Sequence, residues 1–502
     1  FLLIKKKKSN LTSKSDQKVV VLITIDCLRS DHLKSYGYLR NTAPNQEKFV
    51  NKGVRFLNAL ANGPETASSF SSIFSSVLPY LNGGFSPLPN QKLTFPQILD
   101  ENKIYCYGIH SNPNLGAYFN YHRGFKDFIE GINFNVQLGT EEDKKSSISP
   151  IIKQEFFTKI RSRINKVLLN LLNIKFIDMF VDRLKNINYI REKITQANRM
   201  GFTASYIVRK VIDFLKKFNS SKPLFIWAHF MDVHWPYNPP SKNLFKFTHK
   251  YISSQEKAFL LNKVFWNPKD YINTERLNNL INLYDGEMNY TDNTLVKLFN
   301  FLEKRFKKNC LVIITSDHGE GFYEHQFLNH GGYVYDELLK VPLFIVEIGK
   351  IYASKKVQKL VQLIDIGPTI LDYFNIDVPD VFQGKSLFPL MESKSLIRED
   401  CVISESYRKN GRFIREIKNG FKIFSIRKHN WKYIFNEEEK REYLFSLTED
   451  PDEKDNLIVK NPEILKEFRE IKNKHFQEIT KSAEMSKITY AIKAFDFKWN
   501  KI

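Results

Sequence analysis

The sequence predicts an α/β fold in which a mostly parallel central sheet is flanked by helices, with a smaller C-terminal α+β subdomain that contains an antiparallel sheet. Apolar runs rich in β-branched residues, as at 19–25 and 311–314, are typical of strands buried on both faces of a parallel sheet. The segment 283–301 keeps an apolar face at helical spacing and leads into the second run. Near the C-terminus, the short β-prone segments 423–426 and 431–434 are typical of antiparallel strands.

Composition and charge narrow the class of protein. The chain has 502 residues, of which 42% are hydrophobic, enough for a large core and a smaller second domain. Its formal net charge of +21 favours anionic partners, but the lysines are scattered and the sequence contains no recognised nucleic-acid-binding motif. We therefore expect no nucleic acid as partner. No apolar run is long enough to cross a membrane.

The four cysteines, Cys27, Cys106, Cys310 and Cys401, are isolated in the sequence, and each lies in or beside a predicted core strand. Their spacing matches neither a disulfide framework nor a cysteine-rich zinc site. We interpret them as buried thiols. This favours a reducing compartment and hence a cytoplasmic or membrane-associated location.

Three regions are expected along the chain: a disordered basic tail at 1–17, a catalytic domain at 18–375 and a C-terminal subdomain at 376–502. The tail begins with an apolar stub and a lysine cluster, which would also suit the cytoplasmic edge of a preceding membrane helix; we favour a flexible tail. Within the catalytic domain, 148–198 is a basic helical insertion. Its apolar stripe at 150–193 would pack on its own domain, form a lid or contact an anionic membrane, and we favour the first.

Two predicted strands end in residues that could bind a metal ion. Asp26 follows the strand at 19–25, and Asp317 and His318 follow the strand at 311–314. A carboxylate beside an imidazole suits zinc, manganese or a similar divalent ion. The two strand ends can meet at one ion if the strands are neighbours in the sheet. An Asx turn with a surface histidine is the structural alternative.

Two residues close to these strand ends could act on a substrate. Arg29 would either face a substrate anion or form a surface salt bridge. Thr66 opens a helix of small residues after Gly63 and Pro64, where free backbone N–H groups and the positive helix end suit an attacking hydroxyl and a bound tetrahedral anion. The alternative for Thr66 is a simple helix N-cap.

In their order along the chain, these residues resemble the sulfatase branch of the alkaline phosphatase superfamily. The resemblance covers nearly the whole chain and rests on Ile25-Asp26, Leu28-Arg29, Asp31-His32, Tyr36-Gly37-Tyr38, Pro44-Asn45, Gly53-Val54-Arg55-Phe56, Asn58-Ala59 and Thr315-Ser316-Asp317-His318-Gly319-Glu320. It implies an alkaline phosphatase-like sandwich. It also implies one divalent ion, Mn, Zn, Mg or Ca, bound by Asp26, Thr66, Asp317 and His318.

The sequence departs from sulfatases proper at the nucleophile. Those enzymes carry Cys or Ser, which becomes formylglycine and is followed shortly by Pro and Arg; here Thr66 is followed by Ala67, Ser68, Ser69 and Phe70. Threonine cannot form formylglycine. The resemblance therefore implies a hydrolase or transferase of anionic phosphate or sulfate esters, with phosphodiester or phosphotransfer chemistry favoured over sulfate hydrolysis. A catalytically inactive protein of this fold that binds an anionic partner or membrane surface is the alternative.

The resemblance also implies contacts to the substrate. His234 would protonate the leaving group or bond a non-bridging oxygen, and His330 would supply a positive contact. Asn112 lies where family members place polar substrate contacts, with turn chemistry as its alternative. His229 is expected beside these residues as a further substrate ligand.

A second metal ion is the remaining alternative. His229 and Asp232, with His330 or His325, would hold it as in the two-metal phosphatases. We favour one ion, because that is the pattern of the sulfatase branch.

Overall fold

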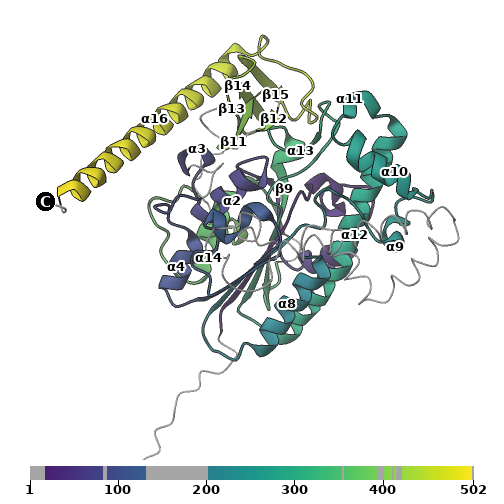
Figure 1. Cartoon of the computed structure of the whole chain (residues 1–502), viewed down its shortest axis with the longest axis horizontal. Helices are drawn as coiled ribbons and strands as arrows, with labels where there is room; N and C mark the ends of the chain where they lie inside the picture. The colour runs from purple at the N-terminus through teal and green to yellow at the C-terminus, as the bar shows by residue number, and fades with distance from the viewer. Residues whose placement is uncertain are drawn as a thin grey trace, which may run out of the picture.

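The computed structural model describes residues 17–82, 88–131, 202–352, 355–393, 401–409, 412–413 and 421–499. Most of the predicted tail and the whole insertion at 148–198, with its apolar stripe, lie outside these residues. The described chain forms a large α/β layer structure, a smaller sheet beside it and one long helix that extends away from both (Figure 1).

The central sheet has eight strands in the order β10-β2-β9-β6-β1-β5-β3-β4. Its strands are β1 (Val19–Ile25), β2 (Val54–Leu60), β3 (Tyr105–His110), β4 (Asp127–Glu130), β5 (Leu224–Phe230), β6 (Cys310–Thr315), β9 (Lys340–Ile348) and β10 (Lys355–Gln362). Only β9 runs antiparallel to its neighbours in this sheet. The prediction of a mostly parallel central sheet is confirmed.

Helices cover both faces of this sheet (Figure 1). One face carries α1 (Pro44–Val50), α8 (Ala204–Lys217) and α12 (Thr274–Arg305), and the other carries α2 (Thr66–Ser75), α4 (Phe95–Glu101) and α14 (Ile366–Tyr373). Side chains alternate along β1: Val21 and Ile23 face the first group, whereas Val20 and Leu22 face the second. Because both faces are covered, all seven residues of β1 are buried, as its continuous apolar run predicted.

The C-terminal subdomain contains an antiparallel sheet of five strands in the order β12-β11-β13-β14-β15. Its strands are β11 (Cys401–Lys409), β12 (Arg412–Phe413), β13 (Phe421–Lys428), β14 (Trp431–Asn436) and β15 (Arg441–Ser446). The last helix, α16 (Pro462–Trp499), packs Leu465 and Phe468 on this sheet and then extends away from the rest of the structure (Figure 1). The predicted antiparallel sheet is confirmed.

Short elements complete the described chain. They are η2 (Ser30–His32), η3 (Lys34–Tyr36), α3 (Pro79–Asn82), η4 (Pro113–Leu115), η5 (Ala117–Phe119), α9 (Ser241–Leu244), α10 (Ser254–Phe259), the π-helical η8 (Leu260–Val264), α11 (Pro268–Tyr271), the hairpin β7 (Gly321–Phe322) and β8 (Leu328–Asn329), α13 (Asp336–Leu339), η9 (Leu363–Asp365) and α15 (Phe388–Met391).

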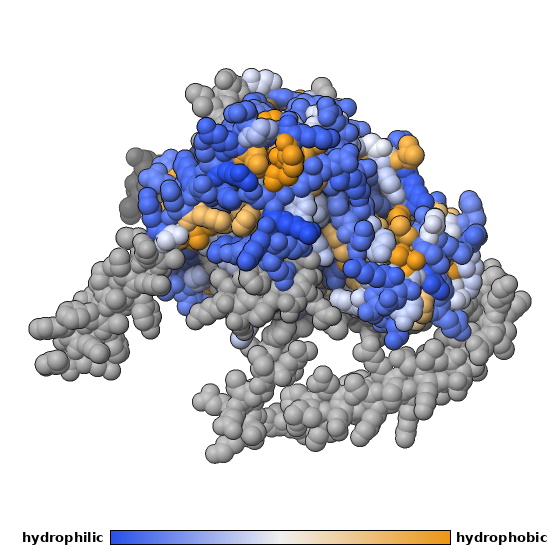
Figure 2. Space-filling model, turned by 90° about the horizontal axis from the view of Figure 1, so that it is seen from above, coloured by the Kyte–Doolittle hydropathy of each residue, from blue (hydrophilic) through white to orange (hydrophobic). Residues whose placement is uncertain are grey.

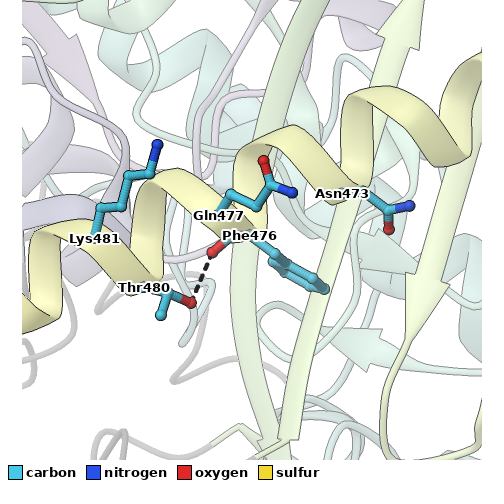
Figure 3. A pocket seen from close by; sticks show the side chains of 5 residues that line it. All are labelled: Asn473, Phe476, Gln477, Thr480 and Lys481. Atoms are coloured by element: carbon cyan, nitrogen blue, oxygen red, sulfur yellow. Dashed lines mark hydrogen bonds between the residues drawn. The ribbon is translucent and has the colours of Figure 1, made fainter.

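The surface is mainly polar. The face in Figure 2 is hydrophilic over most of its described area, with small separate apolar patches, and no helix among the described residues is long and apolar enough to span a membrane. A shallow depression on α16 is lined by Asn473, Phe476, Gln477, Thr480 and Lys481 (Figure 3). The four cysteines are free thiols, and Cys401 is half-buried rather than buried as expected.

Candidate active site and metal centre

The strand order of the central sheet brings the predicted site residues together. β1 lies between β5 and β6, and β3 lies beside β5. These four strands are parallel, so their carboxyl ends share one edge of the sheet. Asp26 follows β1, and Asp317 and His318 follow β6. Asn112 follows β3, and His229 is the last residue but one of β5.

Hydrogen bonds fix the turns at this edge against one another. Ser316 Oγ lies 2.7 Å from the Ile25 carbonyl oxygen and accepts the Leu28 N–H at 2.8 Å. Ser69 Oγ donates to the Asp317 carbonyl at 2.7 Å, which ties the first turn of α2 to the turn after β6. Gly319 is required in that turn because a Cβ there would lie 1.9 Å from the carbonyl oxygen of Glu337.

Thr66 is the first residue of α2, and its hydroxyl faces the two strand ends. Glu65 occupies the N-cap position, so the interpretation of Thr66 as an N-cap is wrong. Thr66 Oγ1 lies 3.4 Å from Asp26 Oδ2 and 3.3 Å from His318 Nε2. Phe70, one turn further on, is fully buried and anchors the helix in the core. The nucleophile candidate is therefore held rigidly at a helix N-terminus.

His318 presents a lone pair toward this hydroxyl. Its Nδ1 lies 2.9 Å from the Gly319 carbonyl oxygen, and only an N–H can bond there, so Nε2 is the unprotonated nitrogen. Burial and the neighbouring His330 lower the pKa of His318 to about 3, which keeps the ring neutral near pH 7. A neutral imidazole with a free Nε2 is the form that binds metal ions.

The ligand atoms of this group are spaced as the ligands of one ion would be. His318 Nε2 lies 3.3 Å from Thr66 Oγ1, 3.6 Å from Asp26 Oδ1 and 3.5 Å from Asp317 Oδ2. Tetrahedral ligands about 2.1 Å from an ion are about 3.4 Å apart, whereas N–H···O bonds cluster at about 2.9 Å. Among the described residues, no side chain donates a hydrogen bond of ordinary geometry to Asp317 Oδ2. Each of these three oxygens therefore lies at a distance from His318 Nε2 that two ligands of one divalent cation would have. Asp26 also forms two groups that could hold an ion, one with Cys27 and His318 and one with His229 and Asp317.

The charges at the site lead to the same conclusion. Burial alone would raise the pKa of Asp26, but the imidazoles of His234, His229 and His318 lower it well below its usual range. Burial and the negative charge of Asp26 raise the pKa of Asp317 well above its usual range. A cation between the two carboxylates would favour the ionised form of both.

Asn112 and His229 both hold Asp26. Asn112 Nδ2 donates to Asp26 Oδ2 at 2.8 Å and lies 3.3 Å from Thr66 Oγ1. His229 Nε2 lies 3.2 Å from the same Oδ2, and its Nδ1 lies 2.9 Å from Thr24 Oγ1. Because both nitrogens of His229 are engaged and the side chain is fully buried, His229 orients the carboxylate. Our expectation that it contacts the substrate is corrected accordingly.

Two imidazoles form the open side of the site. The rings of His234 and His330 lie 5.2 Å apart, and the His330 ring lies 4.3 Å from that of His318. Burial lowers the pKa of His330, but the carboxylate of Glu320, with Oε1 at 3.1 Å from His330 Nδ1, raises it above the ordinary value. Tyr237 donates to the other oxygen of Glu320 at 2.9 Å. Both imidazoles are partly exposed, so an anion can reach them.

Two further predicted contacts are engaged elsewhere. Arg29 donates to Asp31 at 2.6 Å and to Glu324 at 2.5 Å, and is 4% exposed. It therefore forms the salt bridges of the structural alternative, buried rather than at the surface. His325 Nδ1 lies 2.7 Å from Glu337 Oε1, which removes it from the set proposed for a second ion.

The sequence analysis missed two residues of the site. Cys27 was interpreted only as a buried thiol, but its Sγ lies 3.6 Å from His330 Nδ1. Glu65 accepts a hydrogen bond from Ser68 Oγ at 2.8 Å, and burial raises its pKa to about 8. Both residues could have been selected from their position in the sequence, because Cys27 directly follows Asp26 and Glu65 directly precedes Thr66.

The C-terminal subdomain supports the segment that leads into Thr66. From β11, the Glu405 N–H donates to the Asn62 carbonyl at 2.9 Å, and Ser404 Oγ donates to the Ala61 carbonyl at 2.6 Å. These bonds lie within five residues of the nucleophile candidate along the chain. The smaller sheet therefore forms part of the scaffold of the site.

In this protein, the ends of parallel strands bring together two carboxylates, an imidazole and the hydroxyl at a helix N-terminus. This arrangement defines a class of α/β ester hydrolases. The family model described as sulfatase matches residues 18–376, and the chain belongs to the sulfatase family. The model described as the C-terminal part of N-sulphoglucosamine sulphohydrolase matches residues 323–483. The protein is thus an enzyme of the ester hydrolase type.

Relatives and solved structures agree with this membership. An arylsulfatase of Clostridium perfringens is 24% identical over 472 residues, covering 88% of this chain and 90% of that protein. Human arylsulfatase K is 34% identical over 164 residues, covering 31% of this chain and 29% of that protein.

Among solved structures, a phosphonate monoester hydrolase of Agrobacterium radiobacter has a TM-score of 0.64 at 17% identity, covering 92% of this chain and 96% of that chain. A protein solved with its substrate D-glucosamine-2-N,6-O-disulfate has a TM-score of 0.64 at 16% identity, covering 92% and 98% of the two chains. At these identities the likeness establishes the fold.

Proposed function

We propose that the protein cleaves or transfers phosphate esters, with phosphodiesters preferred, through the hydroxyl of Thr66, and that sulfate esters are poorer substrates. The observation that carries this proposal is the position of Thr66 Oγ1, at a helix N-terminus and within 3.4 Å of Asp26 Oδ2 and 3.3 Å of His318 Nε2. Since threonine cannot form formylglycine, the hydroxyl itself must be the nucleophile. The structural likeness to the Agrobacterium phosphonate monoester hydrolase supports a phosphorus rather than a sulfur centre in the substrate, because the name of that enzyme describes a phosphorus ester.

A divalent ion held by Asp26, Thr66, Asp317 and His318 would supply Lewis-acid stabilisation of negative charge at the nucleophile and the reacting centre. The chain supplies the orientation. Asn112 Nδ2, 3.3 Å from Thr66 Oγ1, restricts the hydroxyl rotamer, and Asp26 Oδ2 is the acceptor toward which its proton points. The first N–H groups of α2 face the anion that the hydroxyl attacks.

The reaction then runs in two displacements. Thr66 Oγ forms a bond to phosphorus as its proton passes to Asp26 Oδ2 and the bond to the leaving oxygen breaks, and a phosphothreonine ester results. His234 donates a proton to the leaving oxygen, and His330 donates a hydrogen bond to the equatorial oxygens. Water or an acceptor alcohol next attacks the phosphothreonine and gives its proton to His234, while the proton on Asp26 returns to Thr66 Oγ and restores the hydroxyl.

Turnover of nitrophenyl phosphodiester, phosphomonoester and sulfate-ester substrates by wild type, Thr66→Ala and Thr66→Ser tests this proposal. We expect Thr66→Ala to lose at least about 10³-fold in kcat, because the covalent route is removed, and Thr66→Ser to keep a measurable fraction of it. Mass analysis of acid-quenched wild type should show a phosphorylated peptide that contains Thr66.

The matched control is Ser75→Ala, which removes a hydroxyl at the far end of the same helix. Its bond is to the Ser71 carbonyl at 2.6 Å, remote from the strand ends, and activity should stay near wild type. Full activity of Thr66→Ala would remove the hydroxyl from the mechanism. Faster wild-type turnover of the sulfate ester than of both phosphate esters would overturn the substrate preference.

A further inference from the structure

The thiol of Cys27 lies at the open side of the site, among residues that bind metal ions. Cys27 is the second residue after β1, and its Sγ lies 3.6 Å from His330 Nδ1 and 3.2 Å from Asp26 Oδ1. The chain turns sharply here, because Cys27 adopts a positive φ of 59°. The thiol is fully buried, whereas the imidazole of His330 is 15% exposed.

One ligand atom from each of Cys27, His234 and His330 lies within 4.8 Å of the other two. For a tetrahedral ion with bonds of about 2.3 Å to sulfur and about 2.0 Å to nitrogen, the sulfur–nitrogen separation is about 3.5 Å. The 3.6 Å between Cys27 Sγ and His330 Nδ1 matches this value. Small rotations of the partly exposed His234 side chain would complete the set.

We propose that Cys27, His234 and His330 bind a second cation, a borderline-soft divalent ion of the zinc class, beside the oxygen-rich centre formed by Asp26, Thr66, Asp317 and His318. A thiolate and two imidazoles are ligands that this class prefers over calcium or magnesium. Three protein ligands leave a fourth position open, toward the side from which the anion approaches.

The surroundings favour a cation at this position. The carboxylate of Glu320 is fully buried and lies 3.1 Å from His330 Nδ1, so it adds negative charge beside the ligands, and the ion would replace this hydrogen bond at Nδ1. The thiol donates to Asp26 Oδ1. Once Asp26 binds the first ion, that acceptor is occupied, and a metal ion becomes the better partner for Cys27.

The set differs from the one that the sequence suggested for a second ion. Both ring nitrogens of His229 and both of His325 have hydrogen-bond partners, and Cys27 takes the place expected for a carboxylate. The role of the second ion rests on the proposed function, because the ion would face the same ester anion and act there in place of the direct contacts of His234 and His330. Its binding does not depend on catalysis and can be measured without substrate.

Cobalt(II) titration of the metal-free full-length protein tests the site. We expect two equivalents to bind, with a near-ultraviolet thiolate-to-cobalt charge-transfer band that belongs to one of them. Cys27→Ser should bind one equivalent and lack the band. His234→Ala and His330→Ala should each weaken binding of the ion that gives the band by at least about tenfold, as loss of a ligand requires.

Two controls separate this site from the first. Asp317→Asn removes a ligand of the first ion only, so the thiolate band should persist in that variant. Cys401→Ser changes a thiol in the C-terminal sheet and should leave both stoichiometry and band unaltered.

A single bound equivalent in wild type would overturn the proposal, as would a band that survives in Cys27→Ser. Loss of the band in Asp317→Asn would also overturn it, because Cys27 would then belong to the first ion. Wild type and Asp317→Asn decide the question even if Cys27→Ser fails to fold. Failure of the proposed function would appear separately, as full turnover by Thr66→Ala.

Discussion

Two buried clusters of charge in this protein are built in opposite ways. At the junction between the central sheet and the C-terminal sheet, Lys432 lies 2.8 Å from Asp336 and 2.7 Å from Glu453, and Arg427 also pairs with Asp336. At the strand ends, Asp26 and Asp317 are both fully buried. There the neighbouring imidazole of His318 is neutral, since burial and His330 lower its pKa to about 3.

The difference shows what each cluster requires from outside the chain. At the junction, burial alone would raise the pKa of Asp336, but Arg427 and Lys432 lower it well below its usual range. At the strand ends, burial and the charge of Asp26 raise the pKa of Asp317. The junction therefore pairs two carboxylates with two cationic side chains, whereas at the strand ends a divalent cation would supply the charge that the neutral imidazole of His318 does not.

The largest expected effect concerns the strand ends. Asp317→Asn should reduce turnover at least about 10³-fold, because a ligand and its charge are lost. Wild type should be stabilised by about 2.7 kcal/mol when manganese, which a thiolate site disfavours, reaches 100 times its Kd, and this shift should vanish in the variant. Thermal unfolding with and without the ion measures both stabilities.

Asp213→Asn, a change on the exposed face of α8, is the control and should keep the full metal-induced shift. In the absence of metal, Asp317→Asn should be at least as stable as wild type, because burial and the charge of Asp26 raise the pKa of Asp317 and so oppose its ionisation. Marked destabilisation of the metal-free variant would contradict the comparison of the two clusters.

At the junction we expect a loss of stability that metal does not restore. Lys432→Met leaves Asp336 and Glu453 buried without their shared cation, which typically costs about 3–5 kcal/mol. Lys428→Met is the matched change on the preceding strand: its pair with Glu467 is partly exposed and is worth less than about 1 kcal/mol. Equal effects of the two substitutions on urea-induced unfolding would show that the junction is not held by charge.

The smallest expected effect depends on pH. His475 of α16 is paired with Glu405 of β11, and although burial lowers the pKa of His475, the Glu405 carboxylate raises it above its ordinary value. The stability from this pair should be complete below about pH 6.5 and lost as the pH rises through the raised pKa in the folded state. The difference in unfolding free energy between wild type and His475→Gln should therefore shrink by about 1 kcal/mol between pH 6 and pH 9. A constant difference would mean that the pair contributes no charge interaction.

The parts of the fold that could be predicted from sequence are those set by local pattern. β1 and β6 were recognisable because both faces of each strand are apolar, and their terminal carboxylates followed directly. α12 begins at Thr274, well before the expected helix at 283: Asn273 caps it, and Leu277, Leu280 and Ile281 already keep the helical spacing that was recognised only from Leu283. The local sequence pattern thus predicted the presence of this helix more reliably than it predicted the residue at which the helix begins.

The side-chain roles that were missed depend on contacts between distant parts of the chain. Arg29 is held by Glu324, 295 residues away in sequence, and His229 is turned toward Asp26, 203 residues away. Neither partner adjoins its residue in the sequence. The orientation of these side chains is therefore a property of the packed sheet, which spacing along the chain does not encode.

The hydrogen bonds from β11 to residues 61 and 62 also restrict which recombinations between related genes would give a working protein. The two sheets cannot be exchanged between relatives as independent modules, because a foreign second half would have to reproduce a backbone surface only a few residues from the reacting hydroxyl. Substitutions along that strand are consequently candidates for altering catalysis at a distance, and recombination within the family should favour breakpoints that keep both halves from one parent.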